Sequence, residues 1–447
     1  MRFLKWLYPG MKIKRWILLS WVGLTLFSLG CILIASIKIP VNFELWLKHM
    51  IENATGRTVS SKLIDLGLIF VGLFMIILGI RQWFASIYSA IIPHEQKKLV
   101  EVIYEKRHLG QGLKIVAFGG GTGLSSLLRG LKEYTSNIVA VVAVSDDGGS
   151  SGRLRDELGV IPPGDIRNCL VALADDESLL SEIFQYRFEV GDGISGHNFG
   201  NLFLVALTNV AKDFEKAIKL SSKILAIRGK VLPATLSPTT ICAELSDGTI
   251  VEGETKISKS KSSITKIFLK PADCHPPAEV LQAVKDADAV IFGPGSLYTS
   301  VMPNLLVGGI VDAIKQSKAL KIYVCNVMTQ SGETDKYSAS DHVKAIIRQV
   351  GYPIFDYTLI NEQIPEKLLE KYKAEGSFPV MPDIEEIEKL GVLSITDKLI
   401  SETNLVRHDS KNLAESLIKL ITDLQNHPEK VHKAGEKHSK PKNFIEE

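Results

Sequence analysis

Short cysteine spacings, strong net charge and the common phosphate-binding signatures are all missing from this sequence. Five cysteines in 447 residues, none spaced as a C-x-x-C pair, indicate neither a disulfide framework nor a zinc site and suit a reducing cytoplasm. A net charge of +2, without a Lys/Arg cluster interleaved with aromatic residues, gives no indication of nucleic-acid binding. We also recognise no Ser/His/Asp arrangement and no nucleophile elbow, which argues against hydrolysis by a nucleophilic side chain.

Two long uncharged runs occupy the first hundred residues. Residues 16–37 are long enough to cross a bilayer as a helix, and a second run, residues 66–80, continues through an amphipathic extension. A signal peptide and a buried core helix are the alternatives, but no small-residue cleavage pattern follows the first run. We therefore predict two transmembrane helices. Basic residues precede the first run, so both ends are expected on the cytoplasmic side of the plasma (inner) membrane.

The rest of the chain is expected to form one large cytoplasmic domain. We assign residues 1–92 to a membrane anchor and 93–112 to a charged linker. The domain itself is expected to cover residues 113–425. Residues 426–447 are polar and rich in lysine, which predicts a disordered basic tail.

Strands alternate with helices along this domain. The apolar run 113–118 enters a glycine-rich loop, a helical pattern follows, and a second apolar run covers residues 137–144, which indicates a βαβ unit. Strand and loop recur at residues 289–292 and before Asn326. The pattern predicts an α/β fold with a Rossmann-like doubly wound, mostly parallel sheet, preceded by the two transmembrane helices. Residues 230–268, richer in Thr, Val and Ile, are expected to add antiparallel strands.

Four unusual loops are expected to meet at the carboxyl ends of these strands, where ligands bind in such sheets. They are the GGGTG loop at residues 119–123, the adjacent carboxylates Asp146 and Asp147, the GPGS loop at residues 293–296, and Asn326. The GPGS loop is either a phosphate or sugar contact or only a strand-to-helix turn.

The GGGTG loop places backbone N–H groups at a helix N-terminus, which suits a phosphate. The hydroxyls of Thr122 and Ser125 add donors. The loop is neither a P-loop, which needs a Lys-Ser/Thr pair, nor a complete G-x-G-x-x-G sequence. A glycine turn without a ligand is the alternative.

The adjacent carboxylates Asp146 and Asp147 admit two functional interpretations. They follow the glycines by about the distance at which dinucleotide-binding folds place a ribose-binding acid. They could also hold Mg²⁺ beside a diphosphate, since magnesium prefers one or two carboxylates with substrate oxygens. Helix capping by Asp147 or Ser150 is the structural alternative.

Two later stretches offer further polar groups. In IPPGDIRN, Asp165 is expected to cap a helix whose first turn carries Asn168. In GDGISGHNFGN, Asn198 is expected to cap a strongly apolar helix, with the Asn201 amide one turn along facing the same rim. A lone histidine near a helix start is usually structural, so His197 is not expected to be catalytic.

Several of these segments, taken in order, resemble one bacterial family. They are KIVAFGGGTGLSSLLRGLK, VSDDGGSSGRLRDELGVIPPGDIRNCLVALA, HNFGNLFLVAL, LSPTT, FGPGSLYTSVMPNLLV and CNVMTQSGET. They closely resemble the YvcK-like gluconeogenesis (or morphogenesis) factors of the CofD-like superfamily, over residues 113–412. The N-terminal spans resemble membrane-tethered variants of that family rather than its common cytosolic form.

The resemblance implies a regulatory protein that binds UDP-activated sugars such as UDP-N-acetylglucosamine. Such a protein would support cell-wall synthesis and cell shape during growth on gluconeogenic carbon, with cell-wall or regulatory proteins as partners and with a homo-oligomer as a further expectation. Carried over to this sequence, the nucleotide- and sugar-binding residues would be Gly120, Gly121, Thr122, Gly123, Ser125, Asp146, Asp147, Asn168, Asn198, Asn201, Gly293, Gly295, Ser296 and Asn326.

A Mg²⁺-dependent transferase is the alternative that the same resemblance implies. The CofD branch contains enzymes that transfer a 2-phospholactyl group from a nucleotide diphosphate-linked donor, with Mg²⁺ held by acidic residues. Here Asp146 and Asp147 would be the metal ligands. The sequence departs from that branch in its long SDDGGSSGRLRDELG and PPGDIRN segments, which puts transferase activity in doubt.

Overall fold

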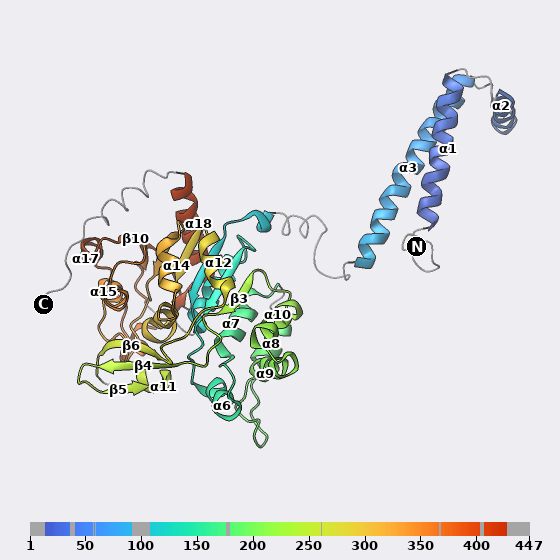
Figure 1. Cartoon of the computed structure of the whole chain (residues 1–447). Helices are drawn as coiled ribbons and strands as arrows, with labels where there is room; N and C mark the ends of the chain where they lie inside the picture. The colour runs from blue at the N-terminus through green and yellow to red at the C-terminus, as the bar shows by residue number, and fades with distance from the viewer. Residues whose placement is uncertain are drawn as a thin grey trace. The chain divides into compact units, whose positions relative to one another are not determined.

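A computed structural model describes most of the chain as two compact units, residues 1–104 and 105–447 (Figure 1). The described residues are 14–35, 41–56, 58, 60–91, 108–175, 179–260, 262–365, 368–402 and 406–426. Most of the predicted linker and nearly all of the predicted tail therefore lie outside the described residues. Of the linker, only residues 108–112 are described, and they include the short helix η2 (Leu109–Gln111).

The first unit is a pair of long apolar helices joined through a shorter one. The three helices are α1 (Lys14–Ile34), α2 (Val41–Thr55) and α3 (Ser61–Ile91). Two segments, Arg15–Ile34 and Ser61–Ser86, are long and apolar enough to cross a membrane, with mean hydropathies of 2.3 and 2.7. This confirms the prediction of two long apolar helices, although α3 begins five residues before the run seen in the sequence.

Glycines allow α1 and α3 to approach closely. A Cβ built on Gly72 would lie 2.5 Å from the backbone nitrogen of Phe27 and 2.7 Å from the carbonyl oxygen of Gly23. Small residues at a crossing give backbone-to-backbone packing, which replaces the hydrophobic effect as the source of helix association in lipid.

The second unit is built on one seven-stranded sheet in which every neighbouring pair is parallel. The strand order is β10-β9-β8-β7-β1-β2-β3, which is the Rossmann order extended by one strand and confirms the predicted doubly wound α/β fold. The strands are β1 (Ile115–Gly119), β2 (Ile138–Val142), β3 (Lys230–Pro233), β7 (Ala289–Phe292), β8 (Leu320–Val324), β9 (Tyr357–Asn361) and β10 (Leu393–Asp397).

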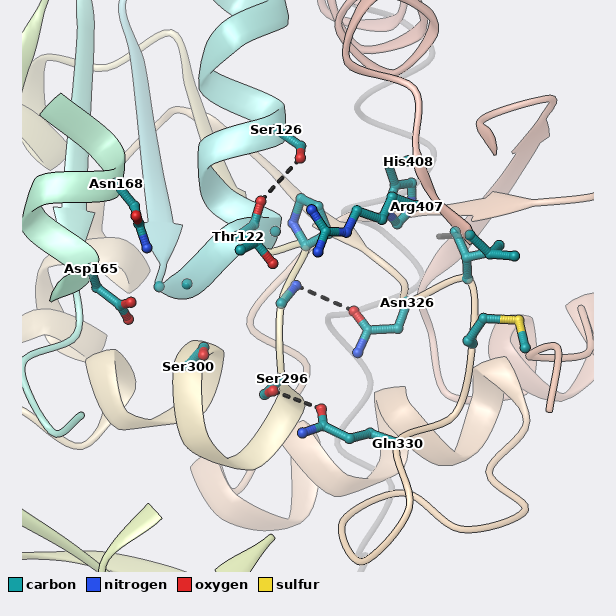
Figure 2. Close-up of a pocket in the computed structure, with 18 of the residues that line it drawn as sticks. Thr122, Ser126, Asp165, Asn168, Ser296, Ser300, Asn326, Gln330, Arg407 and His408 are labelled. Carbon is teal, nitrogen blue, oxygen red and sulfur yellow. Dashed lines mark hydrogen bonds between the residues drawn. The ribbon is translucent and has the colours of Figure 1, made fainter. Parts of the chain in front are cut away.

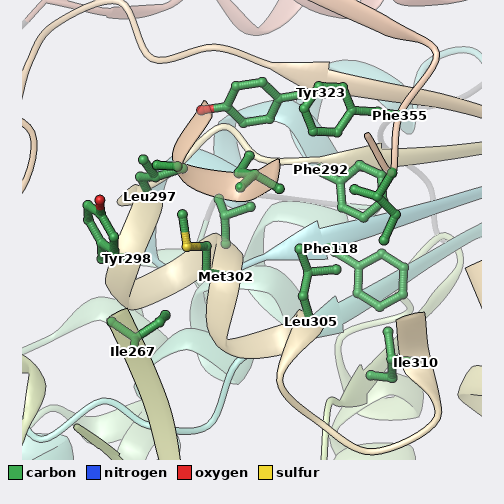
Figure 3. Packing of buried hydrophobic residues seen from close by; sticks show 14 of the residues in the cluster. Phe118, Ile267, Phe292, Leu297, Tyr298, Met302, Leu305, Ile310, Tyr323 and Phe355 are labelled. Atoms are coloured by element: carbon green, nitrogen blue, oxygen red, sulfur yellow. The ribbon is translucent and has the colours of Figure 1, made fainter. Parts of the chain in front are cut away.

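Helices cover both faces of this sheet. Successive residues of its central strands point to opposite sides, so each face carries apolar side chains that have to be buried. Val116 and Phe118 belong to one core, whereas Ile115 and Ala117 belong to the other. In the first core Phe118 and Phe292, from adjacent strands, stack with ring centroids 5.8 Å apart (Figure 3). The covering helices are α5 (Gly121–Leu131), α7 (Gly164–Leu173), α12 (Ala278–Asp286), α14 (Ile310–Gln316), α15 (Ala339–Val350), α17 (Ile384–Lys389) and α18 (Ser410–Asn426).

Smaller elements complete the second unit around the sheet and its covering helices. The predicted antiparallel strands are confirmed as a three-stranded sheet of order β5-β4-β6, although β3, from the same stretch of sequence, joins the parallel sheet instead. These elements are α6 (Gly149–Leu158), α8 (Leu179–Gln185), α9 (Phe199–Ala211), α10 (Phe214–Ile224), β4 (Thr240–Leu245), β5 (Ile250–Glu252), α11 (Glu254–Ile257), β6 (Ile264–Lys270), the π-helix η3 (Leu297–Val301), α13 (Met302–Leu305), α16 (Leu369–Ala374), β11 (Ile400–Glu402) and β12 (Val406–His408).

The contact between α5 and α18 predicts a destabilising substitution. A Cβ on Gly130 would overlap the carbonyl oxygen of Ser410 and lie 2.7 Å from the Ala414 methyl group. We expect Gly130→Ala to lower the free energy of unfolding by about 1–3 kcal/mol through overpacking, despite alanine's better helix propensity. Urea denaturation of residues 105–447 measures the change. Gly110→Ala is the control, because its Cβ would meet nothing closer than 4.0 Å; equal losses would contradict the prediction.

Candidate functional site

A cavity of about 500 Å³ lies where the chain reverses direction across the sheet, between β1 and β7 (Figure 2). The chain proceeds from β1 to β2 and β3 on one side and from β7 to β8, β9 and β10 on the other. The loops that leave β1 and β7 therefore part in opposite directions and leave a crevice at the carboxyl edge of the sheet. Ligands of open α/β sheets bind at this switch point.

The glycine-rich loop after β1 forms one wall of the crevice. Gly120 is the N-cap of α5 and has no side chain, so a capping acceptor has to come from elsewhere. The Asp165 carboxylate of α7 accepts a hydrogen bond from the Gly121 N–H, and Gly120–Gly123 line the cavity beside it. A Cβ on Gly123 would overlap the backbone carbonyl of Pro294, and one on Gly120 would lie 2.6 Å from Oδ2 of Asp165. The glycines are thus required because backbone from β7 and a carboxylate from α7 approach within contact distance.

Nine of the fourteen predicted ligand residues line this cavity. The structure brings them together from α5, the loop after β2, α7, the loop after β7 and the loop after β8. They are Gly120, Gly121, Thr122, Gly123, Asp146, Asn168, Gly295, Ser296 and Asn326. Their binding roles stay predictions, but the expected convergence of four loops on one rim is what the structure shows.

Asp147 is one of the five that do not line the cavity. Its Oδ1 accepts hydrogen bonds from the backbone N–H of Thr255, at 2.9 Å, and from the Thr255 hydroxyl, at 2.6 Å. The adjacent carboxylates have different partners, since Asp146 accepts from the Gly148 N–H at 2.8 Å. Asp146 faces the cavity, while Asp147 fastens α11 and the three-stranded sheet to the loop after β2.

The other four predicted residues serve the framework around the cavity. Ser125 donates to the Gly121 carbonyl at 2.9 Å within α5. Asn198 caps α9 as predicted, by accepting from the Asn201 N–H. Asn201 is buried and donates to the Ser150 hydroxyl at 3.2 Å, so its amide does not reach the rim. Gly293 lies one residue inside the cavity-lining part of its loop.

The prediction that Asp165 caps α7 is wrong. The helix begins at Gly164 with Pro163 at the cap position, so the Asp165 side chain is left to face the cavity beside the glycine loop. Its position after IPPG and before a helical run looked like a cap in the sequence. Only the approach of α7 to α5 reveals it as a cavity residue.

The acidic end of the cavity consists of Asp146, Asp165 and Glu254. Burial raises the pKa of Asp165 to about 7, and the nearby Asp146 charge adds to that rise. Burial also raises the pKa of Glu254 to about 9, with Asp146 and Asp165 contributing. The pKa of Asp146 is raised by burial against the opposing hydrogen bond from the Gly148 N–H. At neutral pH this carboxyl cluster therefore retains protons, unless a bound cation stabilises the ionised form of its members.

The loop after β7 forms the opposite wall of the cavity, and side chains from the loop after β8 hydrogen-bond to it. The Asn326 side-chain oxygen accepts from the Gly295 N–H at 3.3 Å, and the Gln330 side-chain oxygen accepts from the Ser296 hydroxyl at 2.6 Å (Figure 2). Gln330 in turn donates to Oε1 of Glu333 at 2.9 Å, and Glu333 is buried. The loop after β7 is thus fixed from the neighbouring strand, which pre-organises its backbone.

The β12 strand contributes residues to the cavity that no sequence signal indicated. Val406, Arg407 and His408 line it, next to the apolar side chains of Val327 and Met328. The Arg407 side chain is exposed. Arg407 lies more than 280 positions beyond the glycine loop in sequence, and nothing in the local pattern around it is typical of a ligand site. Its contribution follows from tertiary structure alone.

A serine–histidine contact exists that the sequence reading did not recognise. Residues 148–152, GGSSG, have the G-x-S-x-G spacing, and the Ser150 hydroxyl lies 3.1 Å from Nδ1 of His197. Both residues are buried, and the Ser150 oxygen also accepts from the N–H of Asn198. Neither lines the cavity. The contact joins α6 to the start of α9, and it gives the serine no access to a substrate.

The cavity fits magnesium through a different pair of carboxylates from the one expected. No cluster of three or more His, Cys, Asp or Glu side chains suited to a metal occurs in the described part of the chain. Mg²⁺ needs only one or two carboxylates when phosphate oxygens complete its shell. Asp146 and Asp165 face the cavity and meet that requirement, whereas Asp147 is occupied by Thr255.

Comparisons with known proteins place the chain among relatives of one kind. The family model described as 2-phospho-L-lactate transferase CofD matches residues 115–400. The gluconeogenesis factor of Bacillus subtilis is 47% identical over 317 residues, which cover 70% of this chain and 100% of that protein. A Nostoc sp. relative is 48% identical over 431 residues, which cover 94% of this chain and 92% of its own.

A solved structure shows the same fold. The crystal structure of a Bacillus halodurans protein superposes with a TM-score of 0.66 at 50% identity, covering 68% of this chain and 99% of that one. Its length fits the second unit alone, so that relative is folded without such an anchor. The 431 residues shared with the Nostoc protein exceed those of the second unit, so that likeness extends into the anchor.

Replacing Asp165 by Asn tests the charge at the acidic end. The folded-state pKa of Asp165 is about 7 against an ordinary 3.8, so the folded unit binds more protons between these values and loses stability as the pH rises through them. We expect Asp165→Asn to raise the free energy of unfolding at about pH 8.5, by up to about 4 kcal/mol, and to change it little near pH 4. Denaturation of residues 105–447 at both pH values measures this, with exposed Asp156→Asn as the control. A pH-independent difference would contradict it.

Proposed function

The chain belongs to the CofD family, and with that as the premise we propose that its cavity binds a nucleotide-activated sugar of the UDP-N-acetylglucosamine type. The observation that carries the proposal is the pairing of two backbone-rich loops across the switch point. The start of α5 at Gly120–Gly123 and the loop at Gly295 and Ser296 line the same cavity. Backbone N–H groups of such loops bind phosphate oxygens without side-chain charge, and here a phosphate would replace Asp165 and Asn326 as acceptors for Gly121 and Gly295.

The two ends of the cavity support an elongated ligand with a central diphosphate. Val327, Met328 and Val406 offer apolar surface at one end, and Asp146, Asp165 and Asn168 offer hydrogen-bonding groups at the other. Arg407 lines the cavity too and supplies a positive charge for the phosphates. A volume of about 500 Å³ suits a ligand of this size.

We propose a regulatory role rather than catalysis. The Ser150–His197 contact is buried away from the cavity, and the cavity carboxylates are held in positions that favour binding protons or cations. Relatives that carry the name gluconeogenesis factor support a role in gluconeogenic growth. We propose that this role lies in cell-wall synthesis and cell shape, as the family resemblance of the sequence motifs implies.

The apolar helices α1 and α3 would anchor this function in the plasma membrane, with the second unit in the cytoplasm. Their lengths and hydropathies support two spans. The basic residues at the start of α1, Lys14 and Arg15, and those before it favour a cytoplasmic start, and two crossings return the chain to that side.

A Mg²⁺-dependent transferase of the 2-phospholactate type is the second candidate. The acidic end of the cavity favours it, because Asp146 and Asp165 could hold Mg²⁺ against a nucleotide diphosphate-linked donor. The metal would neutralise the phosphates and lower the pKa of both carboxyls. The name of the matching family model supports the same candidate.

Calorimetric titration of residues 105–447 tests the binding proposal directly. We expect UDP-N-acetylglucosamine to bind, and Arg407→Gln to weaken binding at least about tenfold, since a hydrogen bond to a charged group contributes about 1.5–3 kcal/mol. Arg348→Gln on α15 is the matched control, because Arg348 is exposed and does not line the cavity. No heat with UDP-N-acetylglucosamine, or equal losses in both variants, would refute the proposal.

Product analysis separates the regulatory role from the transferase. We expect UDP-N-acetylglucosamine to remain intact over hours of incubation with the protein and Mg²⁺, because the cavity hydroxyls of Ser126 and Ser296 donate to the Thr122 carbonyl and to Gln330 and not to a general base. If the protein is instead a transferase with a nucleotide diphosphate-linked donor, a nucleoside diphosphate such as GDP should bind only with Mg²⁺. Asp146→Asn should then abolish this binding. Asp147→Asn should then leave it intact, since Asp147 faces Thr255. Steady conversion of UDP-N-acetylglucosamine or of GDP into products would refute the proposal of a purely regulatory role.

A further inference from the structure

Arg167 on α7 lies behind the wall of the cavity and touches a residue that lines it. Its Nη2 donates to the side-chain oxygen of Asn168 at 2.7 Å, and its Nη1 donates to the side-chain oxygen of Asn201 at 2.9 Å. Asn168 lines the cavity, whereas Arg167 and Asn201 do not. The Arg167 guanidinium is therefore connected to a ligand through the Asn168 amide.

The hydrogen bond from Arg167 decides which way the Asn168 amide points. A guanidinium donates hydrogen bonds and accepts none, so it must meet the oxygen of the amide and leave the NH2 group on the other side. Figure 2 shows that nitrogen turned toward the loop that precedes Thr122. At this position the cavity wall therefore offers a hydrogen-bond donor and not an acceptor.

The guanidinium is held in turn by a chain of hydrogen bonds from α9 and α6. The NH2 group of Asn201 donates to the Ser150 hydroxyl at 3.2 Å, which leaves its oxygen for Arg167. The Ser150 oxygen also accepts from the Asn198 N–H at 3.2 Å, so its own proton goes to Nδ1 of His197, 3.1 Å away. Donor and acceptor roles are thus fixed along the whole chain, and neither amide can turn over without losing a partner.

The surroundings of Arg167 suit a side chain that stays in one place. A Cβ on Gly200 of α9 would lie 2.7 Å from Cδ of Arg167, so the helix leaves room for the stem of the arginine. Burial lowers the pKa of Arg167, but the nearby charges of Asp165 and Asp146 oppose this, and an arginine keeps its charge in proteins. The guanidinium is therefore a permanent, packed donor behind the acidic end of the cavity.

We propose that Arg167 is a positioning residue of the cavity: it holds the Asn168 amide so that this part of the wall binds an acceptor oxygen of the ligand. A ligand group that can only donate would meet a second donor there and leave both unpaired, which costs binding free energy. Diphosphate and sugar both carry acceptor oxygens, and titration with UDP separates them. The identity of the ligand rests on the proposed function, whereas the orientation of the amide does not.

A double-mutant cycle tests whether Arg167 acts through Asn168. The full chain in detergent micelles is titrated calorimetrically with UDP-N-acetylglucosamine as wild type, Arg167→Gln, Asn168→Ala and the double variant. We expect each single variant to bind about tenfold more weakly, since each loses the oriented donor. The double variant should also bind about tenfold more weakly, and not about a hundredfold, because the second substitution removes nothing further.

Arg153→Gln on α6 is the matched control, because Arg153 is exposed, donates to the Ser195 carbonyl and does not line the cavity. It removes the same charge and should leave the affinity unchanged. Arg167→Lys keeps the charge, but an ammonium cannot span two amide oxygens as a guanidinium does, so it should lose affinity like Arg167→Gln. Single variants that bind as tightly as wild type, or losses that multiply in the double variant, would overturn the proposal.

Titration with UDP identifies the acceptor oxygen. A loss of affinity in Asn168→Ala for both UDP and UDP-N-acetylglucosamine assigns the donor to a phosphate, and a loss for the sugar nucleotide alone assigns it to the sugar. Undiminished binding of both ligands to this variant would overturn the proposal.

Thermal unfolding without ligand separates this inference from the proposed function. A thiol-reactive dye follows the second unit in a Cys31→Ser background, because the remaining four cysteines are buried in that unit. We expect the midpoint temperature of the double variant to fall by less than the sum of the two single falls, since both single variants break the same contact. Additive falls would overturn the proposal. If wild type does not bind UDP-N-acetylglucosamine, the proposed function fails and this measurement alone decides the inference.

Discussion

The contact between the loops that leave β1 and β7 is the constraint on which the rest of the second unit depends. At Gly123 the start of α5 meets the Pro294 carbonyl so closely that no side chain fits between them. This contact closes the sheet at its switch point, brings the N-terminus of α5 to the GPGS loop, and sets the width of the crevice. A larger residue here would separate the two halves of the fold as well as the two walls of the cavity.

Charge in the crevice is set by elements that lie far apart in sequence. The Asp147–Thr255 bond fastens α11 against the loop after β2, and this places Glu254 beside Asp146 and Asp165. Three carboxyl groups in one half-buried space cannot all ionise without a compensating cation. The same cluster therefore explains the raised pKa values of these groups and the attraction of magnesium in the alternative function.

The two units contribute different features: the second contains the cavity, and the first contains the two long apolar helices. Proteins with a chain the length of the second unit fold and bear the name gluconeogenesis factor, so the cavity belongs to that unit. The first unit adds two apolar helices whose close packing at Gly23 and Gly72 suits a membrane. Every residue that lines the cavity belongs to the second unit.

The sequence by itself determined the architecture and most of one rim. Alternating apolar runs and helical patterns predicted the doubly wound sheet, and the strand-to-loop transitions predicted eight cavity residues. The ninth, Asn168 on α7, was expected only from the family resemblance. These are local signals, because a strand end and its loop are adjacent in the chain. The divergence of Asp146 from Asp147, the turning of Asp165 into the cavity, and the arrival of Glu254 and Arg407 were decided only by tertiary structure. Which way a polar side chain points depends on which distant backbone approaches it, and local sequence does not contain that information.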